Sequence, residues 1–143
     1  MIGLMGSIDG LNLNNFHIRF LSWHEFSHSI INPLIEEQSN IVNNYNHLYE
    51  PIKEKMQNQA YNNWEISVIE HIIRACTNLM VKKYYGDEKY KFLQEREFNN
   101  GFLYINSISN FLQSKKCDEK SNTYQLFKES LDEMMQCLTT AST

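Results

Sequence analysis

The sequence predicts a mainly α-helical domain with at most a short β element near its N-terminus. Apolar residues recur at helical spacing along most of the chain, and only five glycines and two prolines interrupt them. A chain of 143 residues fits one domain, and the sequence shows neither an internal repeat nor a low-complexity tract. We therefore expect residues 1–143 to form a single domain.

The first 32 residues are expected to pass from a β element into a helix. Residues 2–5 are typical of a short strand and residues 7–10 of the turn behind it. Residues 16–20 form either its partner strand or the lead into a helix. That helix is expected from Phe20 to Asn32, because the proline at position 33 disfavours helical geometry in the residue before it.

A polar helix over residues 34–56 is expected next, with a break or kink near Pro51, because proline removes a backbone donor and clashes one turn back. A long helix then begins near Gln59 or Trp64. Two lysines in its last turn suit the negative end of the helix dipole, and Gly86 can adopt the left-handed conformation that ends a helix.

Three further helices complete the expected fold. Asp87 can cap the first, which reaches Phe98 and is closed by Gly101. The other two are expected over residues 102–115 and 122–138. Apolar side chains on one side of the last helix predict a core-facing stripe rather than a binding groove: Tyr124, Phe127, Leu131, Met134, Met135 and Leu138. Further core candidates are Trp64, Phe102 and Phe111.

Charge and cysteine usage narrow the classes of function. The net charge is −4 and the thirteen Lys and Arg residues are scattered, so no basic surface for nucleic acid is expected. Three widely spaced cysteines suit reduced thiols. The sequence shows no signal peptide and no membrane span. We expect a cytoplasmic protein, or a secreted or cell-surface one if a further segment precedes this chain.

The segment SWHEFSHSI, residues 22–30, contains an HExxH motif. His24 and His28 are four residues apart, so on a helix both rings can face one metal ion, with Glu25 beside it. A catalytic Zn²⁺ site has three protein ligands and an open position for a water, whose pKa it lowers to about 7. Glu25 would take the proton of this water as general base and pass it to the leaving amine.

The motif helix is apolar nearly all round, which predicts that it is buried. Two buried histidines and a glutamate need partners, and a metal ion would supply them. The alternative is a pair of core histidines bonded to backbone carbonyls, with Glu25 in an ion pair. A di-iron bundle needs two ExxH motifs, and the sequence has one. The apolar residues around the motif are Phe20, Leu21, Trp23, Phe26, Ile30 and Ile31.

A third ligand is expected from the long helix, in the segment WEISVIEHIIRA, residues 64–75. Its candidates are Glu65, Glu70 and His71, and helical periodicity alone does not choose among them. Glu70 also has a simpler interpretation, an intrahelical ion pair with Arg74 four residues on.

HEFSHSIINPL, followed by YNNWEISVIEHIIRA and GFLYI, resembles an uncharacterised bacterial family of zinc metallopeptidases of the gluzincin type, within the zincin group. The resemblance covers residues 20–115. It implies a zincin-like helical core, a peptide or protein substrate and one Zn²⁺ ion. It also implies that Glu70 is the third ligand beside His24 and His28, with Glu25 as the base.

The chain departs from the zincin group before the motif. Those enzymes place a twisted sheet there, whose edge strand holds an extended peptide. The short segment that precedes residue 20 leaves room for a strand or two. The chain is therefore either the C-terminal catalytic half of a longer protein or a reduced relative with impaired substrate binding. The alternative function is a noncatalytic metal-binding or helical protein-interaction module with a vestigial site, which a fourth protein ligand would favour.

Supporting roles can be assigned to residues near the expected ligands. The amide of Asn32 either holds a histidine ring or caps the helix before Pro33, and capping is the simpler role. Arg74 can orient Glu70. Candidates for stabilising an oxyanion, each more simply a packing or surface residue, are His71, Tyr61 and Tyr104.

Overall fold

The chain is built from helices. The computed structural model describes the backbone of residues 8–115 and 123–141 and the side chains of residues 16–115 and 129–140. Its elements are α1 (Ile8–Glu36), α2 (Ser39–Asn43), the 3-10 helix η1 (Asn46–Ile52), α3 (Lys53–Asn58), α4 (Trp64–Tyr85), α5 (Asp87–Asn99), α6 (Ile105–Ser114) and α7 (Thr123–Ala141). No strand occurs within these ranges, which confirms the expected mainly α fold. The strand expected over residues 2–5 lies outside them.

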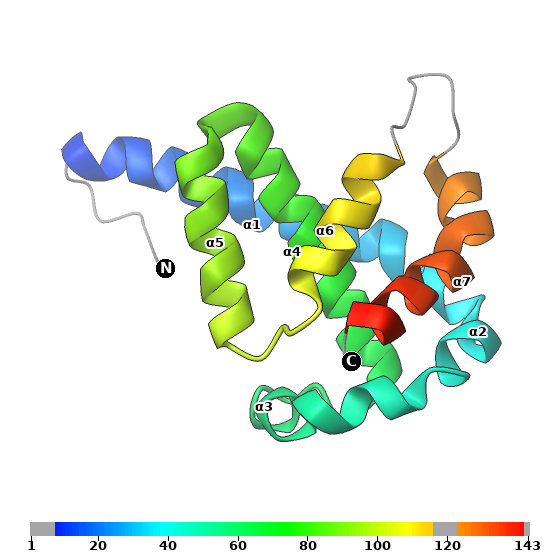
Figure 1. Ribbon diagram of the computed structural model, residues 1–143. Helices are drawn as coiled ribbons and strands as arrows, with labels where there is room; N and C mark the ends of the chain where they lie inside the picture. Colours follow the sequence, from blue (N-terminus) through cyan, green and yellow to red (C-terminus); the bar gives the residue numbers. More distant parts are fainter. Residues whose placement is uncertain (1–7, 116–122, 142–143) are drawn as a thin grey trace.

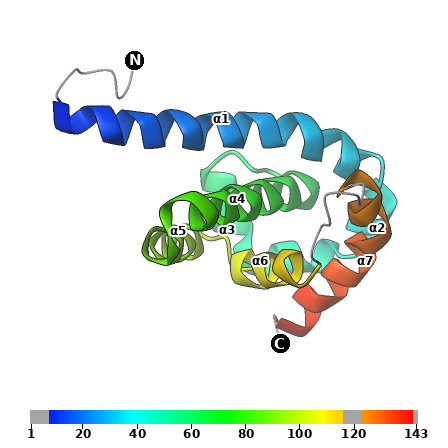
Figure 2. The same ribbon diagram turned by 90° about the horizontal axis from the view of Figure 1, so that it is seen from above.

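Helix α4 is the central element. It lies between α1 on one side and α5 and α6 on the other, and α7 packs across the end of α6 (Figure 1, Figure 2). A continuous apolar core forms around it, and its fully buried members come from almost every helix: Leu34, Ile35, Val42, Met56, Ile72, Ile73, Ile105, Ile108, Leu131 and Met135. Within the described residues no helix has the length and apolarity that crossing a membrane requires.

Both ends of α4 follow from local chemistry. Asn63 caps its N-terminus, because its side-chain oxygen accepts a hydrogen bond from the backbone N–H of Ile66 at 2.8 Å. Lysines 82 and 83 occupy the last turn, and Gly86 follows with a φ of 98°. The sequence therefore predicted this helix and its end correctly. Of the two expected beginnings, Gln59 and Trp64, the structure shows Trp64.

Helix α1 is longer at both ends than the sequence predicted. Residues 8–10 and 16–20 are helical, so the expected turn and the partner strand are wrong, and the lead into a helix is correct. The helix also continues through Pro33 to Glu36 instead of ending at Asn32. Leu34 and Ile35 are at most 1% exposed, so their burial outweighs the local bias against a helix before proline.

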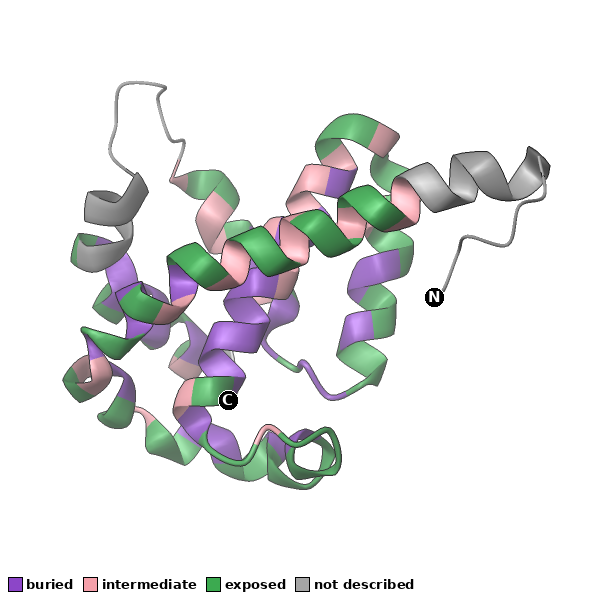
Figure 3. Cartoon of the chain, turned by 180° about the vertical axis from the view of Figure 1, so that it is seen from behind, coloured by how far each residue is buried: buried purple, intermediate pink, exposed green. Residues whose placement is uncertain are grey.

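The motif helix is not buried all round, contrary to expectation. One face of α1 lies against α4 and the other faces outward (Figure 3). Leu21, Phe26 and Ile30 are 48%, 67% and 41% exposed. An apolar circumference predicts burial only where other elements surround the helix on all sides. Among the described residues, the neighbouring helices cover only one side of α1.

The segment between α1 and α4 is also more broken than expected. Instead of one helix over residues 34–56 kinked near Pro51, the chain forms α2, η1 and α3, with Pro51 inside η1. Asparagine is frequent here, and its side chain competes with helical hydrogen bonding. Buried Val42, Leu48 and Met56 fix these short helices to the core instead.

The C-terminal helices are close to those expected. Gly86, not Asp87, is the N-cap of α5, and Asp87 is its first helical residue. The following helix begins at Ile105 rather than at residue 102. The core stripe of α7 is confirmed at Leu131, Met134, Met135 and Leu138, whereas the side chains of Tyr124 and Phe127 lie outside the described ones. Trp64 and Phe102 are buried as expected, and Phe111 packs partly buried against the core.

Candidate metal centre

The contact between α1 and α4 brings three ligand-type side chains together. His28 Nε2 lies 3.0 Å from Glu70 Oε1, and His24 Nε2 lies 3.9 Å from Glu70 Oε2. One donor atom from each of the three residues lies within 4.8 Å of the other two. Tetrahedral zinc with bonds of about 2.1 Å places its ligand atoms about 3.4 Å apart. The observed separations lie on either side of that value, so this group can hold a metal ion.

One carboxylate oxygen of Glu70 is buried without a hydrogen bond. Glu70 is 5% exposed, and its Oε2 atom is buried without a hydrogen-bond partner. Arg74 Nε lies 3.5 Å from this oxygen but does not form a hydrogen bond with it. An unsatisfied buried carboxylate oxygen is costly. A cation between Glu70 and the two imidazoles would remove that cost, and two nitrogens with one oxygen suit a transition metal.

Asn32 sets the orientation of the second histidine ring. Its Oδ1 lies 3.2 Å from His28 Nδ1, one helical turn away. An amide oxygen only accepts, so Nδ1 donates to Asn32 and Nε2 is the ring nitrogen that faces Glu70. A cation or a proton between Nε2 and Glu70 Oε1 would stabilise their separation of 3.0 Å. Asn32 therefore holds the ring, and the helix cap considered for it is wrong because α1 continues past it.

The environment of His24 favours the form that binds a metal. Desolvation by burial lowers the pKa of His24, and the nearby carboxylate of Glu70 opposes this effect without cancelling it. The ring is therefore neutral at neutral pH. A neutral imidazole offers the lone pair that metal ligation requires.

Arg74 lies behind Glu70 in a network that the sequence revealed only in part. Its Nη1 donates to Glu97 on α5, which is 1% exposed and also binds Arg96 at 3.0 Å. Burial lowers the pKa of Arg74, but attraction to Glu97 and hydrogen bonds outweigh it and raise the pKa above its ordinary value. The expected proximity of Arg74 and Glu70 is present, and Glu97 holds the arginine in place.

Glu97 is the residue of this network that sequence reasoning missed. It sits in the charged segment QEREFN, which is typical of a solvated helix face. Leu93, one turn earlier, is buried and shares its face. That i, i+4 relation was the signal that could have marked Glu97 as inward-facing.

The other candidates are engaged elsewhere. Glu65 accepts a short hydrogen bond from Ser39. His71 is buried in the core with Nδ1 bonded to the Ser67 carbonyl at 2.7 Å, and desolvation lowers its pKa to about 4. Tyr104 donates to the Leu48 carbonyl at 2.6 Å. These contacts leave none of the three in the ligand group.

Tyr61 is tied to the network rather than to the ligands. Its hydroxyl accepts a hydrogen bond from Arg74 Nη2 at 3.2 Å. The guanidinium of Arg74 also lies 4.4 Å from the centre of the Phe102 ring. Tyr61 therefore helps to position Arg74, and its role in stabilising an oxyanion stays a prediction.

The ligand group keeps an exposed side. The side chains of His24 and His28 are 20% and 28% exposed, and Glu25 is exposed beside them. Glu25 follows His24 directly in the sequence, so it lies one position round the helix from this ligand. Among the described residues, no fourth His, Cys, Asp or Glu joins the three. The ligand group is therefore partly open to solvent.

These features define a mainly helical domain with an open His-His-Glu group at a helix contact. The family model described as "Domain of unknown function (DUF4932)" matches residues 6–137. The chain belongs to this family, whose description states no activity. Comparison with curated proteins and with solved structures found no match in either set.

Proposed function

We propose that the protein is a zinc-dependent metallopeptidase in which His24, His28 and Glu70 bind one Zn²⁺ ion. The observation that supports this most directly is the buried, unsatisfied Oε2 of Glu70 facing two histidines of an HExxH motif. The resemblance of the motif and the EHIIRA segment to zinc metallopeptidases of the gluzincin type agrees with this ligand set.

Each residue near the proposed zinc site would have a separate role in hydrolysis. Zinc bound by the three ligands would polarise a water molecule and a peptide carbonyl. The Glu25 carboxylate would accept the proton of the attacking water and later give it to the leaving amine nitrogen. Asn32 would hold His28 in the tautomer that presents Nε2. Arg74 and Glu97 would keep Glu70 in position.

A noncatalytic metal-binding module is the second candidate. It is favoured by the lack of any strand within residues 8–115 and 123–141, because zincin-group enzymes hold an extended peptide along a strand edge. The open side of the ligand group, with no fourth ligand among the described residues, favours the peptidase instead.

Metal analysis separates the ligand set from the chemistry. The wild type should hold one zinc per chain, and His24→Ala and Glu70→Ala should lose it. Glu65→Ala is the matched control for Glu70→Ala, because it removes a carboxylate from the same helix and should keep the metal. Zinc retained by Glu70→Ala would show that the ligand assignment is incorrect.

Peptide hydrolysis then distinguishes the two candidate functions. Glu25→Gln should keep zinc and lose cleavage of an unstructured peptide library, whereas Glu36→Gln, an exposed carboxylate at the end of α1, should cleave normally. A wild type that binds zinc tightly but cleaves no library peptide supports the noncatalytic module. Cleavage by Glu25→Gln at the wild-type rate contradicts the proposed mechanism.

A further inference from the structure

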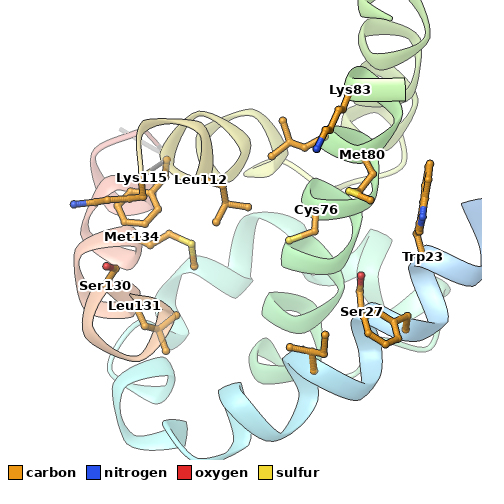
Figure 4. Close-up of a pocket in the computed structure, with 14 residues that line it drawn as sticks. Trp23, Ser27, Cys76, Met80, Lys83, Leu112, Lys115, Ser130, Leu131 and Met134 are labelled. Carbon is orange, nitrogen blue, oxygen red and sulfur yellow. The ribbon is translucent and has the colours of Figure 1, made fainter. Parts of the chain in front are cut away.

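A large, partly open cavity lies beside α1, and none of the three ligand-type residues lines it. It encloses about 650 Å³ between α1, α4, α6 and α7, and its lining is almost entirely apolar (Figure 4). This volume falls within the range of about 300–1,000 Å³ typical of small-molecule sites. Its lining includes Trp23, Phe26, Ile30, Leu112, Lys83 and Lys115.

The cavity and the metal centre lie on different faces of α1, and none of the three ligand-type residues lines the cavity. Residues two positions apart on a helix point about 200° apart. Phe26 follows His24 by two positions and Ile30 follows His28 by two, whereas Trp23 and Ser27 form the edge of the cavity wall nearer to the histidines. The cavity is therefore not the cleft in which a peptide would meet the metal. Its apolar wall needs a different explanation.

Among the described residues, the two charged side chains that line the cavity are both lysines, although the chain as a whole carries a net charge of −4. Lys115 pairs with Glu133 at 3.1 Å, and in Figure 4 its ammonium group points away from the cavity. Lys83 extends from α4 towards the space between α4 and α6 (Figure 4). Among the described residues no carboxylate forms an ion pair with Lys83.

We propose that this cavity binds a single-chain anionic amphiphile, with its hydrocarbon chain among the apolar side chains of four helices and its carboxylate at Lys83. Burial of an alkyl chain in an apolar interior is favourable. The Lys83 ammonium group lies over the Tyr84 ring and has no carboxylate partner among the described residues, so it favours a negative head group at the rim. The exposed Phe26 and the half-buried Trp23 form the wall on α1. Trp23 is stacked against Tyr84 with the ring centres 5.8 Å apart, which holds its ring in one orientation at the cavity wall.

The test uses dodecanoate below its micelle concentration, with dodecanol and dodecyltrimethylammonium as chains of equal length. Binding is followed by calorimetry and by Trp23 fluorescence, with Trp23→Phe reporting the buried Trp64 alone. Dodecanoate should bind with one site per chain and more tightly than the other two. Equal binding of all three would overturn the recognition of an anionic head group, and no saturable binding would overturn the site.

Two variants locate the site and one serves as control. Lys83→Met should weaken dodecanoate binding about threefold to fivefold, as expected for a partly exposed ion pair, and leave dodecanol unchanged. Lys53→Met removes an equally exposed lysine on α3 and should change neither. Leu112→Trp should fill the cavity and weaken both ligands. Because Lys83 and Leu112 lie at the surface or partly buried, both variants should fold, which circular dichroism checks.

Other occupants give different results. Binding only to vesicles of anionic phospholipid, without binding of free dodecanoate, would identify a membrane surface and contradict the proposal. A dimer in sedimentation that Phe26→Lys converts to a monomer would show that a second copy of this chain covers the cavity. Unchanged dodecanoate affinity in Leu112→Trp would place the ligand elsewhere. All of these measurements are made with and without zinc, because the cavity should bind equally in both states.

Discussion

Replacing Glu97 by glutamine should destabilise the protein and weaken metal binding together. The substitution keeps the size of the side chain but removes the charge that pairs with Arg74 and Arg96. Breaking a buried ion pair costs about 3–5 kcal/mol. The side chains of Arg74 and Arg96 are 20% and 43% exposed, so water compensates part of this loss. We expect a loss of about 2 kcal/mol in the free energy of unfolding.

This change is large enough to measure by two routes. Chemical denaturation of the metal-free protein gives the free energy directly, and for a domain of this size the melting temperature should fall by about 6 °C. Zinc affinity, measured by competition with a chromophoric chelator, should fall about tenfold, because Arg74 would no longer be held behind Glu70. Glu95→Gln, an exposed neighbour on the same helix, is the matched control and should change neither quantity.

The two measurements also test the reasoning separately. A Glu97→Gln protein with the stability of the wild type would refute the inferred strength of the Arg74 pairing. Lowered stability with unchanged zinc affinity would show that the network stabilises the fold without positioning Glu70.

Three further predictions concern the fold. His71 has a pKa of about 4 in the folded protein against 6.5 when unfolded, so between these pH values only the unfolded state binds a proton at this residue. The free energy of unfolding of the metal-free protein should therefore fall by about 3 kcal/mol as the pH falls from 6.5 to 4. In denaturant titrations, His71→Phe should flatten this pH dependence. Gly101→Ala should lower the free energy of unfolding by at least about 2 kcal/mol, and by more than Gly86→Ala does. Both glycines have a positive φ, but only at position 101 would an added Cβ atom meet Lys55 Cβ at 2.6 Å. Equal losses of stability in denaturation would contradict this clash. Tyr104→Phe should lose about 1–2 kcal/mol in the same assay, because it leaves the Leu48 carbonyl without its donor, and an unchanged stability would count against that hydrogen bond.

The sequence predicted the part of the candidate site that depends on a single helix, namely the common face of the two histidines. The spacing of His24 and His28 fixes their common face as soon as the segment is helical, and it is. The choice of Glu70 over Glu65 and His71 depends on how α4 is rotated against α1. That rotation is a tertiary property, so periodicity left it open and only the resemblance favoured Glu70.

The same distinction explains the errors in the fold. The end of α4 was predicted because lysines and a glycine act on their own helix. The continuation of α1 through Pro33 was missed because Leu34 and Ile35 gain burial from other helices, which outweighs a local bias. Glu97 was missed for a related reason: its partner Arg74 lies on another helix, and only the packing of α5 against α4 makes the pair visible.

Helix α1 carries apolar residues on more faces than packing against α4 requires. A helix that serves only to present two histidines needs one apolar face, directed at the core. In α1, Phe26 and Ile30 are apolar but 67% and 41% exposed, so they add little to the core. Both line the large cavity, whereas the exposed Ile18 and Leu21 do not. If a ligand covers Phe26 and Ile30, their exchange for polar residues should leave core stability nearly unchanged while dodecanoate affinity falls, and the same exchange at Leu21 should change neither.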